Sequence, residues 1–152
     1  MTLYICGTPI GNLEDATFRL IRILQEVDLI ACEDTRHTGK LLQHYSIQKR
    51  TISYHHHNRR QREALLIEEL KSGKNVALVS DAGMPGISDP GYELIRRAYE
   101  ENIDVEIIPG PSALVSALVL SGFDSSRFVF EGFLPPRTTA RRQRLRELGT
   151  ET

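Results

Sequence analysis

The chain has 152 residues, of which 40% are hydrophobic and 26% are charged. This composition is typical of one soluble globular domain and excludes a disordered chain. Its 19 Lys and Arg residues nearly balance its 20 Asp and Glu residues, and the resulting net charge of −1 excludes a uniformly basic protein that coats nucleic acid.

The two cysteines, Cys6 and Cys32, lie in apolar runs and form no C-x-x-C pair. This excludes zinc-ribbon and thioredoxin-type sites and favours buried, reduced thiols. The first residues lack the basic start and apolar core of a signal peptide, and no apolar run approaches the ~20 residues of a membrane helix. We therefore expect a cytoplasmic protein that does not contact a membrane.

Short apolar runs alternate with helical segments along the chain. Because most of these runs are short and apolar at consecutive positions, they predict strands that are covered on both faces. The predicted strands are Leu3–Cys6, Leu29–Cys32, Thr51–Tyr54, Val76–Val79 and Val105–Ile108, with Phe128–Phe130 as a weaker sixth candidate.

Four helices are predicted between and after these strands. They are Ala16–Glu26, Arg59–Ser72, a segment from Pro90 to about Glu101, and Pro111–Ser121. Asn58 and Gly73 flank the second helix as its cap and its stop, and Asp89 is the expected cap of the third. The fourth helix is apolar on nearly every side, which predicts a buried helix.

Strands that alternate with helices indicate β-α-β units. We therefore predict an α/β fold with a mostly parallel five-stranded sheet and helices on both faces. Ligands of such sheets bind beyond the carboxyl ends of the strands. The loops at those ends are Gly7–Asn12, Glu33–Arg36, Tyr54–Asn58, Ser80–Gly91 and Pro109–Ala113.

The loop Ser80–Gly91 carries the strongest sign of a binding site. It holds three glycines and two prolines in 12 residues, a combination that gives close backbone approach and a stiff, preorganised path. The loop Gly7–Asn12 matches neither G-x-G-x-x-G nor the Walker pattern, so a plain turn and a ligand loop both stay open. Pro109–Ala113 would offer free N–H groups at a helix start.

Charged residues after the second strand allow two interpretations. Glu33, Asp34 and Arg36 could bind ligand hydroxyls or an amine, or Asp34 or Thr35 could cap a helix. The consecutive histidines His55–His57 alternate sides in an extended segment, so we expect solvated side chains and no metal site.

Five arginines within ten residues lie near the end of the chain. They could form the solvated face of a helix or contact RNA, since the guanidinium group suits phosphate. They are Arg137, Arg141, Arg142, Arg144 and Arg146.

Taken together, six motifs resemble the small-subunit ribosomal RNA methyltransferase I family of the tetrapyrrole methylase superfamily. They lie in family order over essentially the whole chain. The motifs are Thr8–Leu13, Cys32–Arg36, Val79–Gly83, Ile87–Gly91, Pro109–Ala113 and Gly132–Pro135.

The resemblance implies S-adenosylmethionine-dependent 2′-O-methylation of a cytidine ribose in small-subunit ribosomal RNA, by a homodimer of two-domain subunits. The implied cofactor-binding residues are Pro9, Asp81, Ala82, Gly83, Gly86, Ser112 and Ala113. Candidate substrate-binding residues are Glu33, Arg36, Arg137, Arg141 and Arg142. The ribose hydroxyl needs a base, and Glu33 and the histidines are candidates by location; the catalytic residue stays open.

The chain departs from the family pattern in two motifs. Asn12 stands near a position where many relatives carry an aspartate, and His55–Arg59 reads His-His-His-Asn-Arg instead of His-Glu-His-Asn-Glu. We expect 1–134 to form an N-terminal methylase domain and 135–152 to be a basic linker towards an absent second domain. The chain alone is then expected to be weakly active or inactive.

Three other functions are alternatives to this one. A non-catalytic cofactor-binding or dimerisation domain stays open, as does one half of a methylase that acts on a small tetrapyrrole. A phosphate-accepting receiver domain needs an acidic pair after the first strand, where this chain has Gly7 and Thr8.

Overall fold

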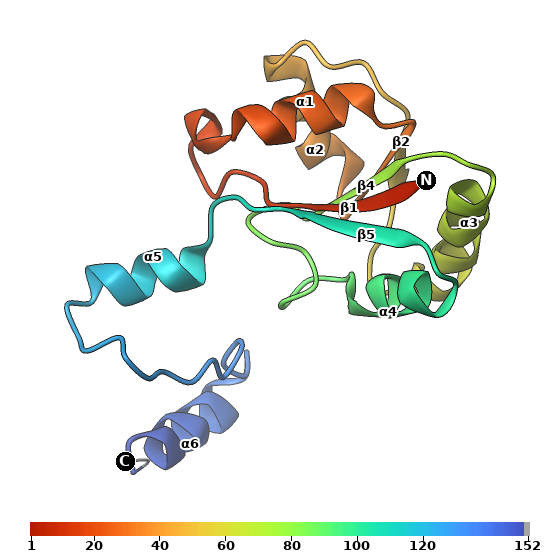
Figure 1. Ribbon diagram of the computed structural model, residues 1–152. Helices are drawn as coiled ribbons and strands as arrows, with labels where there is room; N and C mark the ends of the chain where they lie inside the picture. The colour runs from red at the N-terminus through yellow and green to blue at the C-terminus, as the bar shows by residue number, and fades with distance from the viewer. Residues whose placement is uncertain (151–152) are drawn as a thin grey trace. The chain divides into compact units, whose positions relative to one another are not determined.

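The computed structural model describes residues 1–150, which divide into two units, Met1–Ser121 and a second unit that starts at Gly122 (Figure 1). The elements of the first unit are β1 (Thr2–Cys6), η1 (Leu13–Asp15), α1 (Phe18–Glu26), β2 (Leu29–Cys32), α2 (Thr35–His44), β3 (Thr51–Ser53), α3 (Arg59–Lys71), β4 (Val76–Val79), α4 (Tyr92–Glu100), β5 (Asp104–Ile108) and α5 (Ala113–Leu120). The second unit contains α6 (Thr138–Leu148).

The five strands form one sheet in the order β3-β2-β4-β1-β5, and every adjacent pair is parallel. The predicted parallel sheet is therefore confirmed, and β2 and β4 have the predicted bounds. The sixth candidate, Phe128–Phe130, was wrong. This segment is exposed and pairs with no strand among the described residues, so its apolar and aromatic side chains alone did not make it a strand.

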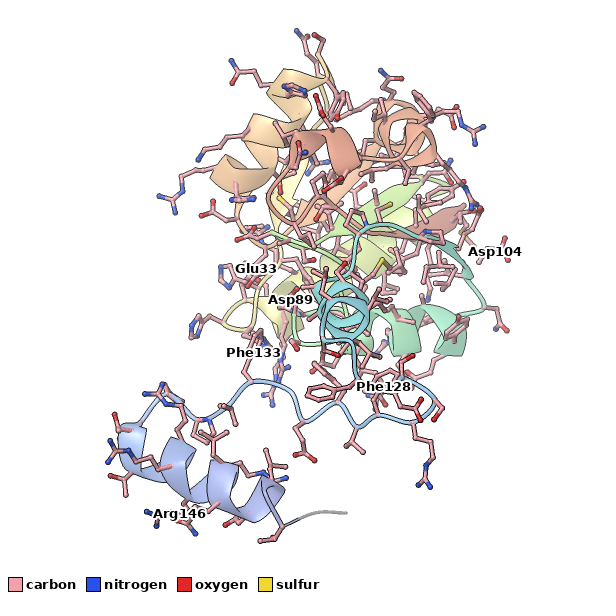
Figure 2. The ribbon with its side chains drawn as sticks, turned by 90° about the vertical axis from the view of Figure 1, so that its left-hand side faces the viewer. Glu33, Asp89, Asp104, Phe128, Phe133 and Arg146 are labelled. Atoms are coloured by element: carbon pink, nitrogen blue, oxygen red, sulfur yellow. The ribbon has the colours of Figure 1, made fainter. Side chains whose placement is uncertain are left out.

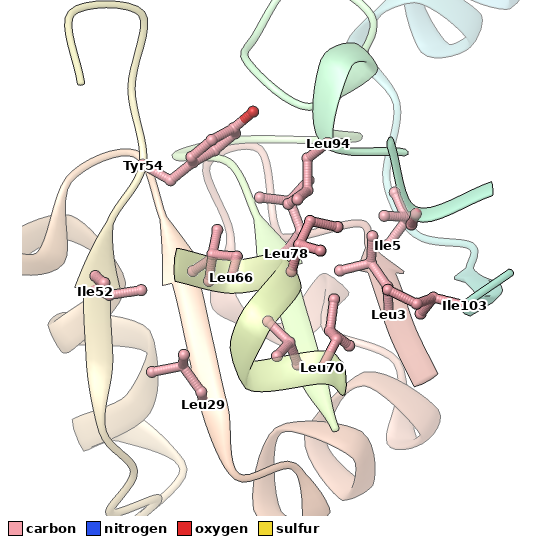
Figure 3. Close-up of a cluster of buried hydrophobic side chains, with 14 residues drawn as sticks. Leu3, Ile5, Leu29, Ile52, Tyr54, Leu66, Leu70, Leu78, Leu94 and Ile103 are labelled. Atoms are coloured by element: carbon pink, nitrogen blue, oxygen red, sulfur yellow. The ribbon is translucent and has the colours of Figure 1, made fainter. Parts of the chain in front are cut away.

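Helices cover both faces of the sheet, as predicted. Helices α1 and α2 pack on one face, and α3 and α4 pack on the other (Figure 1). Along β4, Val76 and Leu78 belong to the α3–α4 side, whereas Ala77 and Val79 belong to the α1–α2 side. This alternation explains why the strands are apolar at consecutive positions. Figure 3 shows the α3–α4 side.

The start of α4 differs from the prediction. The helix begins at Tyr92 after Gly91, whose φ is 156°, and Asp89 does not cap it. A Cβ atom at Gly91 would lie 3.1 Å from the Gly86 nitrogen, so the loop folds closely on itself here. This packing between two glycines keeps Asp89 and Pro90 in the loop.

Helix α5 was predicted to be buried, and this was wrong. None of its residues is buried, and Val119 and Leu120 are 71% and 86% exposed. The physical reason is that no element of the first unit packs over its apolar side chains.

Helix α3 follows Asn58 and ends at Lys71, shortly before Gly73, whose φ is 93°, in agreement with the predicted bounds. The predicted cap was wrong, because the Asn58 side chain bonds Ser53 and makes no capping hydrogen bond to the helix.

The second unit consists of an irregular segment and α6. The predicted boundary between 134 and 135 falls inside this unit and stays a prediction. Residues 151–152 of the predicted linker lie outside the described residues. No helix in residues 1–150 is long and apolar enough to cross a membrane.

Both cysteines are buried and free, in agreement with the expected thiols. Burial raises the pKa of Cys6 to about 12. Such a thiol stays protonated near neutral pH and is therefore inert as a nucleophile.

Candidate functional site

The loops after β1 and β4 are joined at the carboxyl edge of the sheet. The Thr8 nitrogen donates to Gly83 O at 2.9 Å, and the Gly83 nitrogen donates to Thr8 O at 3.0 Å. The Thr8 hydroxyl also donates to Ser80 O at 3.1 Å, and this threonine is only 3% exposed. Because β1 leads to α1 on one face and β4 leads to α4 on the other, a crevice opens between their loops.

Two glycines bring the loop after β5 against the loop after β1. The Gly7 nitrogen donates to Ile108 O at 3.0 Å, and a Cβ atom at Gly110 would lie 2.6 Å from Gly7 O. No larger residue fits there without moving the backbone. Beyond this contact, the Ser112 hydroxyl caps α5 by accepting a hydrogen bond from the Val115 nitrogen at 3.5 Å.

A cleft of about 370 Å³ lies at this edge, a volume that suits a small organic ligand. Its lining comes from the loops after β1 and β4 and from α2. The lining residues are Thr8, Pro9, Ile10, Gly11, Asn12, Leu13, His37, Thr38, Lys40, Leu41, Ser80, Asp81 and Ala82.

Three of the predicted cofactor-binding residues, Pro9, Asp81 and Ala82, line this cleft together. Gly83 is the partner of Thr8 in the contact beside it. The other three predicted residues are not in its lining: Gly86 lies further along the same loop, and Ser112 and Ala113 lie at the start of α5.

Sequence reasoning missed the contribution of α2 to the cleft. His37, Lys40 and Leu41 lie three or four residues apart on one helix, so they face the same side. The signal that could have found them is this spacing, directly after a strand whose loop was already a candidate.

Of the two interpretations that the sequence left open for the charged residues after β2, the structure shows the helix cap. Asp34 caps α2, accepting a hydrogen bond from the Arg36 nitrogen at 2.8 Å. Its carboxylate also pairs with the Arg36 guanidinium at 2.7 Å, which holds the pKa of Asp34 well below its usual range. The Arg36 side chain is 89% exposed, so its charge faces solvent.

Glu33, in contrast, belongs to a group of carboxylates at the strand ends. It is half-buried, and burial together with the nearby Asp89 and Asp81 raises its pKa, which His56 partly offsets. Figure 2 shows Glu33 and Asp89 at the same end of the sheet. The Asp81 carboxylate accepts a hydrogen bond from the Asp34 nitrogen at 3.1 Å. This arrangement favours a ligand with amino or hydroxyl groups.

The remaining candidates lie in the second unit. Arg137 precedes α6, and Arg141 and Arg142 lie on it, all exposed. Within residues 1–150, no group of three or more His, Cys, Asp or Glu side chains is arranged to hold a metal ion.

A doubly wound parallel sheet with a cleft at its carboxyl edge defines an α/β ligand-binding domain. The family model for Tetrapyrrole (Corrin/Porphyrin) Methylases matches residues 2–152, and the chain belongs to this family. A solved uroporphyrin-III-C-methyltransferase from Thermus thermophilus has the same fold, with a TM-score of 0.63 at 22% identity over 83% of this chain and 54% of that chain.

Relatives with higher sequence identity make the resemblance more specific. The chain is 57% identical to "Ribosomal RNA small subunit methyltransferase I" of Synechocystis sp., over 98% of this chain and 53% of the relative. Proteins of the same name from Thermotoga maritima and Escherichia coli O157:H7 are 54% and 52% identical over 98% of this chain, covering 67% and 52% of the relatives. The resemblance inferred from the motifs is confirmed. The chain spans about half the length of most of these relatives.

Proposed function

We propose that the protein methylates small-subunit ribosomal RNA, with S-adenosylmethionine as the methyl donor and the 2′-oxygen of a cytidine ribose as the acceptor. In this proposal the chain is the N-terminal half of a two-domain, homodimeric cytoplasmic enzyme, with its domain at 1–134 and its linker at 135–152. The observation that carries the proposal is the cleft at the carboxyl edge, which unites Pro9, Asp81 and Ala82 in a chain of this family.

The lining of the cleft suits this cofactor. Pro9, Ile10 and Leu13 offer apolar surface for a ring, and Ser80 and Asp81 offer oxygen atoms to hydroxyl and amino groups. In our proposal Pro9, Asp81 and Ala82 hold the cofactor directly, while Gly83 and Gly86, both with positive φ, shape the loop. Ser112 and Ala113 extend the site from the start of α5. When bound, the cofactor supplies an activated methyl group.

The acceptor hydroxyl has to lose a proton, and Glu33 suits this task. Its raised pKa makes its carboxylate a stronger proton acceptor than that of an ordinary glutamate. Glu33 directly follows β2, and β2 is next to β4 in the sheet. Glu33 is therefore near the loop after β4, which carries Asp81. In this proposal Arg36, Arg137, Arg141 and Arg142 contribute positive charge towards RNA.

Cofactor binding by the complete gene product tests the proposal, with Asp81→Asn as the variant. The asparagine keeps an oxygen for the Asp34 nitrogen but removes the negative charge, so calorimetry should show affinity for S-adenosylmethionine about 10- to 100-fold lower. Asp104→Asn, at the exposed start of β5, is the matched control and should bind normally.

Methyl transfer to isolated small ribosomal subunits, followed with tritiated S-adenosylmethionine, is the second measurement. Transfer by the wild type, lost or slowed in Asp81→Asn, supports the proposal. Cofactor binding without transfer would favour the non-catalytic binding domain instead, and wild-type protein that binds no cofactor would contradict both.

A further inference from the structure

A second hollow, which we call the α3 groove, lies at the carboxyl end of β3. It has a volume of about 370 Å³ and is lined by the loop after β3 and the first turn of α3. No carboxylate is among its lining residues, and His56, His57 and Arg60 are exposed in it. The lining residues are His56, His57, Asn58, Arg59, Arg60 and Gln61.

The loop of this groove is held in a fixed shape by one side chain. The Asn58 amide oxygen accepts a hydrogen bond from the His55 nitrogen at 2.8 Å. The Asn58 amide nitrogen donates to Ser53 O at 3.1 Å and to the Ser53 hydroxyl at 3.2 Å. The side chain is therefore used to brace the loop against the end of β3, and it does not cap α3. The groove is preorganised.

The two arginines in the groove differ in their partners. Arg59 forms an ion pair with Glu93. No acidic side chain of residues 1–150 pairs with Arg60, so its guanidinium is available to an anion from outside. Since the groove itself contains no carboxylate, the anion would meet no like charge in its lining.

The groove lies beside the candidate active site. Strand β3 neighbours β2, which ends at Cys32 and is followed by Glu33, and β2 neighbours β4, which leads to Asp81. Adjacent strands are about 4.8 Å apart, so the ends of β3 and β4 are separated by roughly 10 Å. A polymer whose reacting group lies near Glu33 would thus pass its neighbouring segments over the groove.

We propose that the α3 groove binds a backbone phosphate of the substrate RNA, with Arg60 as the principal contact and His56 and His57 at its sides. The proposal rests on the proposed function and deepens it, because it assigns an RNA-binding surface to the sheet-containing unit. The fork of N–H donors in arginine suits phosphate oxygens. The groove would position the RNA and would contribute no base recognition.

The test compares Arg60→Gln with wild type in the complete gene product. Binding of protein-free small-subunit ribosomal RNA is measured at several salt concentrations. We expect the variant to bind RNA with about fivefold lower affinity. The slope of log affinity against log salt concentration should be smaller by about 0.7–0.9, which corresponds to the loss of one phosphate contact. In methyl transfer, KM for the RNA should rise while kcat and the affinity for S-adenosylmethionine stay unchanged.

Arg22→Gln is the matched control. Arg22 is an exposed arginine of α1, on the opposite face of the sheet, and it too has no carboxylate partner in the described part of the chain. It should leave both affinity and salt slope unchanged.

The outcomes separate the two proposals. If Arg60→Gln matches Arg22→Gln in affinity and slope while the wild type methylates RNA, the groove proposal is overturned and the proposed function stands. If the wild type binds cofactor but neither binds nor methylates RNA, the proposed function fails and the groove proposal fails with it. A changed slope with normal cofactor binding supports both, because a folding defect would not alter the slope alone.

Discussion

The two edges of the sheet use charged residues differently. At the amino edge, charges are paired: Glu69 accepts hydrogen bonds from Arg50 and Lys74, and Glu101 pairs with Lys71. At the carboxyl edge, Glu33 lies near two further carboxylates, and the exposed Arg60 has no carboxylate partner within residues 1–150. The amino edge is thus organised for stability. The carboxyl edge also contains two ion pairs, Asp34–Arg36 and Arg59–Glu93, but it keeps Glu33 and Arg60 available for a ligand.

The backbone shows the same difference. Gly7 and Gly110 are in close contact at the carboxyl edge, whereas Gly73, at the amino edge, has no atom within 4 Å of where a Cβ would stand. Glycine is required at positions 7 and 110 because two loops of the site pack closely there. Glycine is favoured at position 73 only because the end of the helix needs a positive φ.

The largest effect is expected from Gly110→Ala. Its methyl group would overlap the Gly7 backbone, so the free energy of unfolding should fall by about 3 kcal/mol and cofactor binding should weaken. Gly73→Ala, where the only cost is the positive φ, should lose about 1 kcal/mol and keep normal cofactor affinity. Urea unfolding and calorimetry of both variants provide the measurement. Equal losses of unfolding free energy and of cofactor affinity in the two variants would contradict the proposed difference between the edges.

Much of the fold followed from the sequence because of the way β-strands bury their side chains. Most predicted strands were apolar at consecutive positions, and β2 and β4 are buried along their whole length in the structure. Strand β5 differs: it contains Glu106, and Ile107 is 57% exposed, so the expectation that this strand is covered on both faces was wrong. The same rule could not assign α5. A helix that is apolar all round needs a cover, but its sequence does not say whether the described chain supplies one.

The site was predictable where loops at the strand ends form it and less so where a helix contributes to it. Pro9, Asp81 and Ala82 come from loops at strand ends, which the fold class alone brings together. The contribution of α2 depended on whether Asp34 caps a helix or binds a ligand. The α3 groove depended on the hydrogen bonds from Asn58 to Ser53, five residues earlier, which the sequence pattern did not distinguish from a helix cap.

An intermediate effect is expected from a pair of asparagines, one at each edge. The Asn75 side-chain oxygen accepts a hydrogen bond from the Thr2 nitrogen at 2.9 Å, as Asn58 accepts one from His55. Asn75→Ala and Asn58→Ala should each lower the free energy of unfolding by about 1 kcal/mol. Only Asn58→Ala should also weaken RNA binding, because it alone shapes the groove.

Thermal unfolding and RNA binding of the two asparagine variants are the measurements. Loss of RNA affinity in both variants would mean that binding follows global stability. Normal RNA affinity in Asn58→Ala would mean that the loop after β3 does not contact RNA.

The smallest effect on stability is expected from substitution of one glutamate at each edge, Glu69 and Glu33. These two variants test the difference between the edges through the pH dependence of stability. The hydrogen bond from Lys74, aided by Arg50, lowers the pKa of Glu69, so this residue stabilises the fold above the ordinary glutamate pKa and loses that contribution as pH falls through the lowered value. Burial, with Asp89 and Asp81 nearby, raises the pKa of Glu33. Its charged form therefore destabilises the fold once pH rises above the ordinary value, and fully so above the raised one.

The two substitutions should consequently act with opposite sign. Glu69→Gln should lower the midpoint of thermal unfolding near pH 7, and Glu33→Gln should raise it. Both differences from wild type should shrink in acid, as the carboxyls of the wild type become protonated. Because Glu33 is also the proposed proton acceptor, its variant should be more stable yet transfer methyl groups more slowly. Destabilisation by both variants would show that Glu33 is held by its surroundings as Glu69 is, and that the carboxyl edge is not specialised for function.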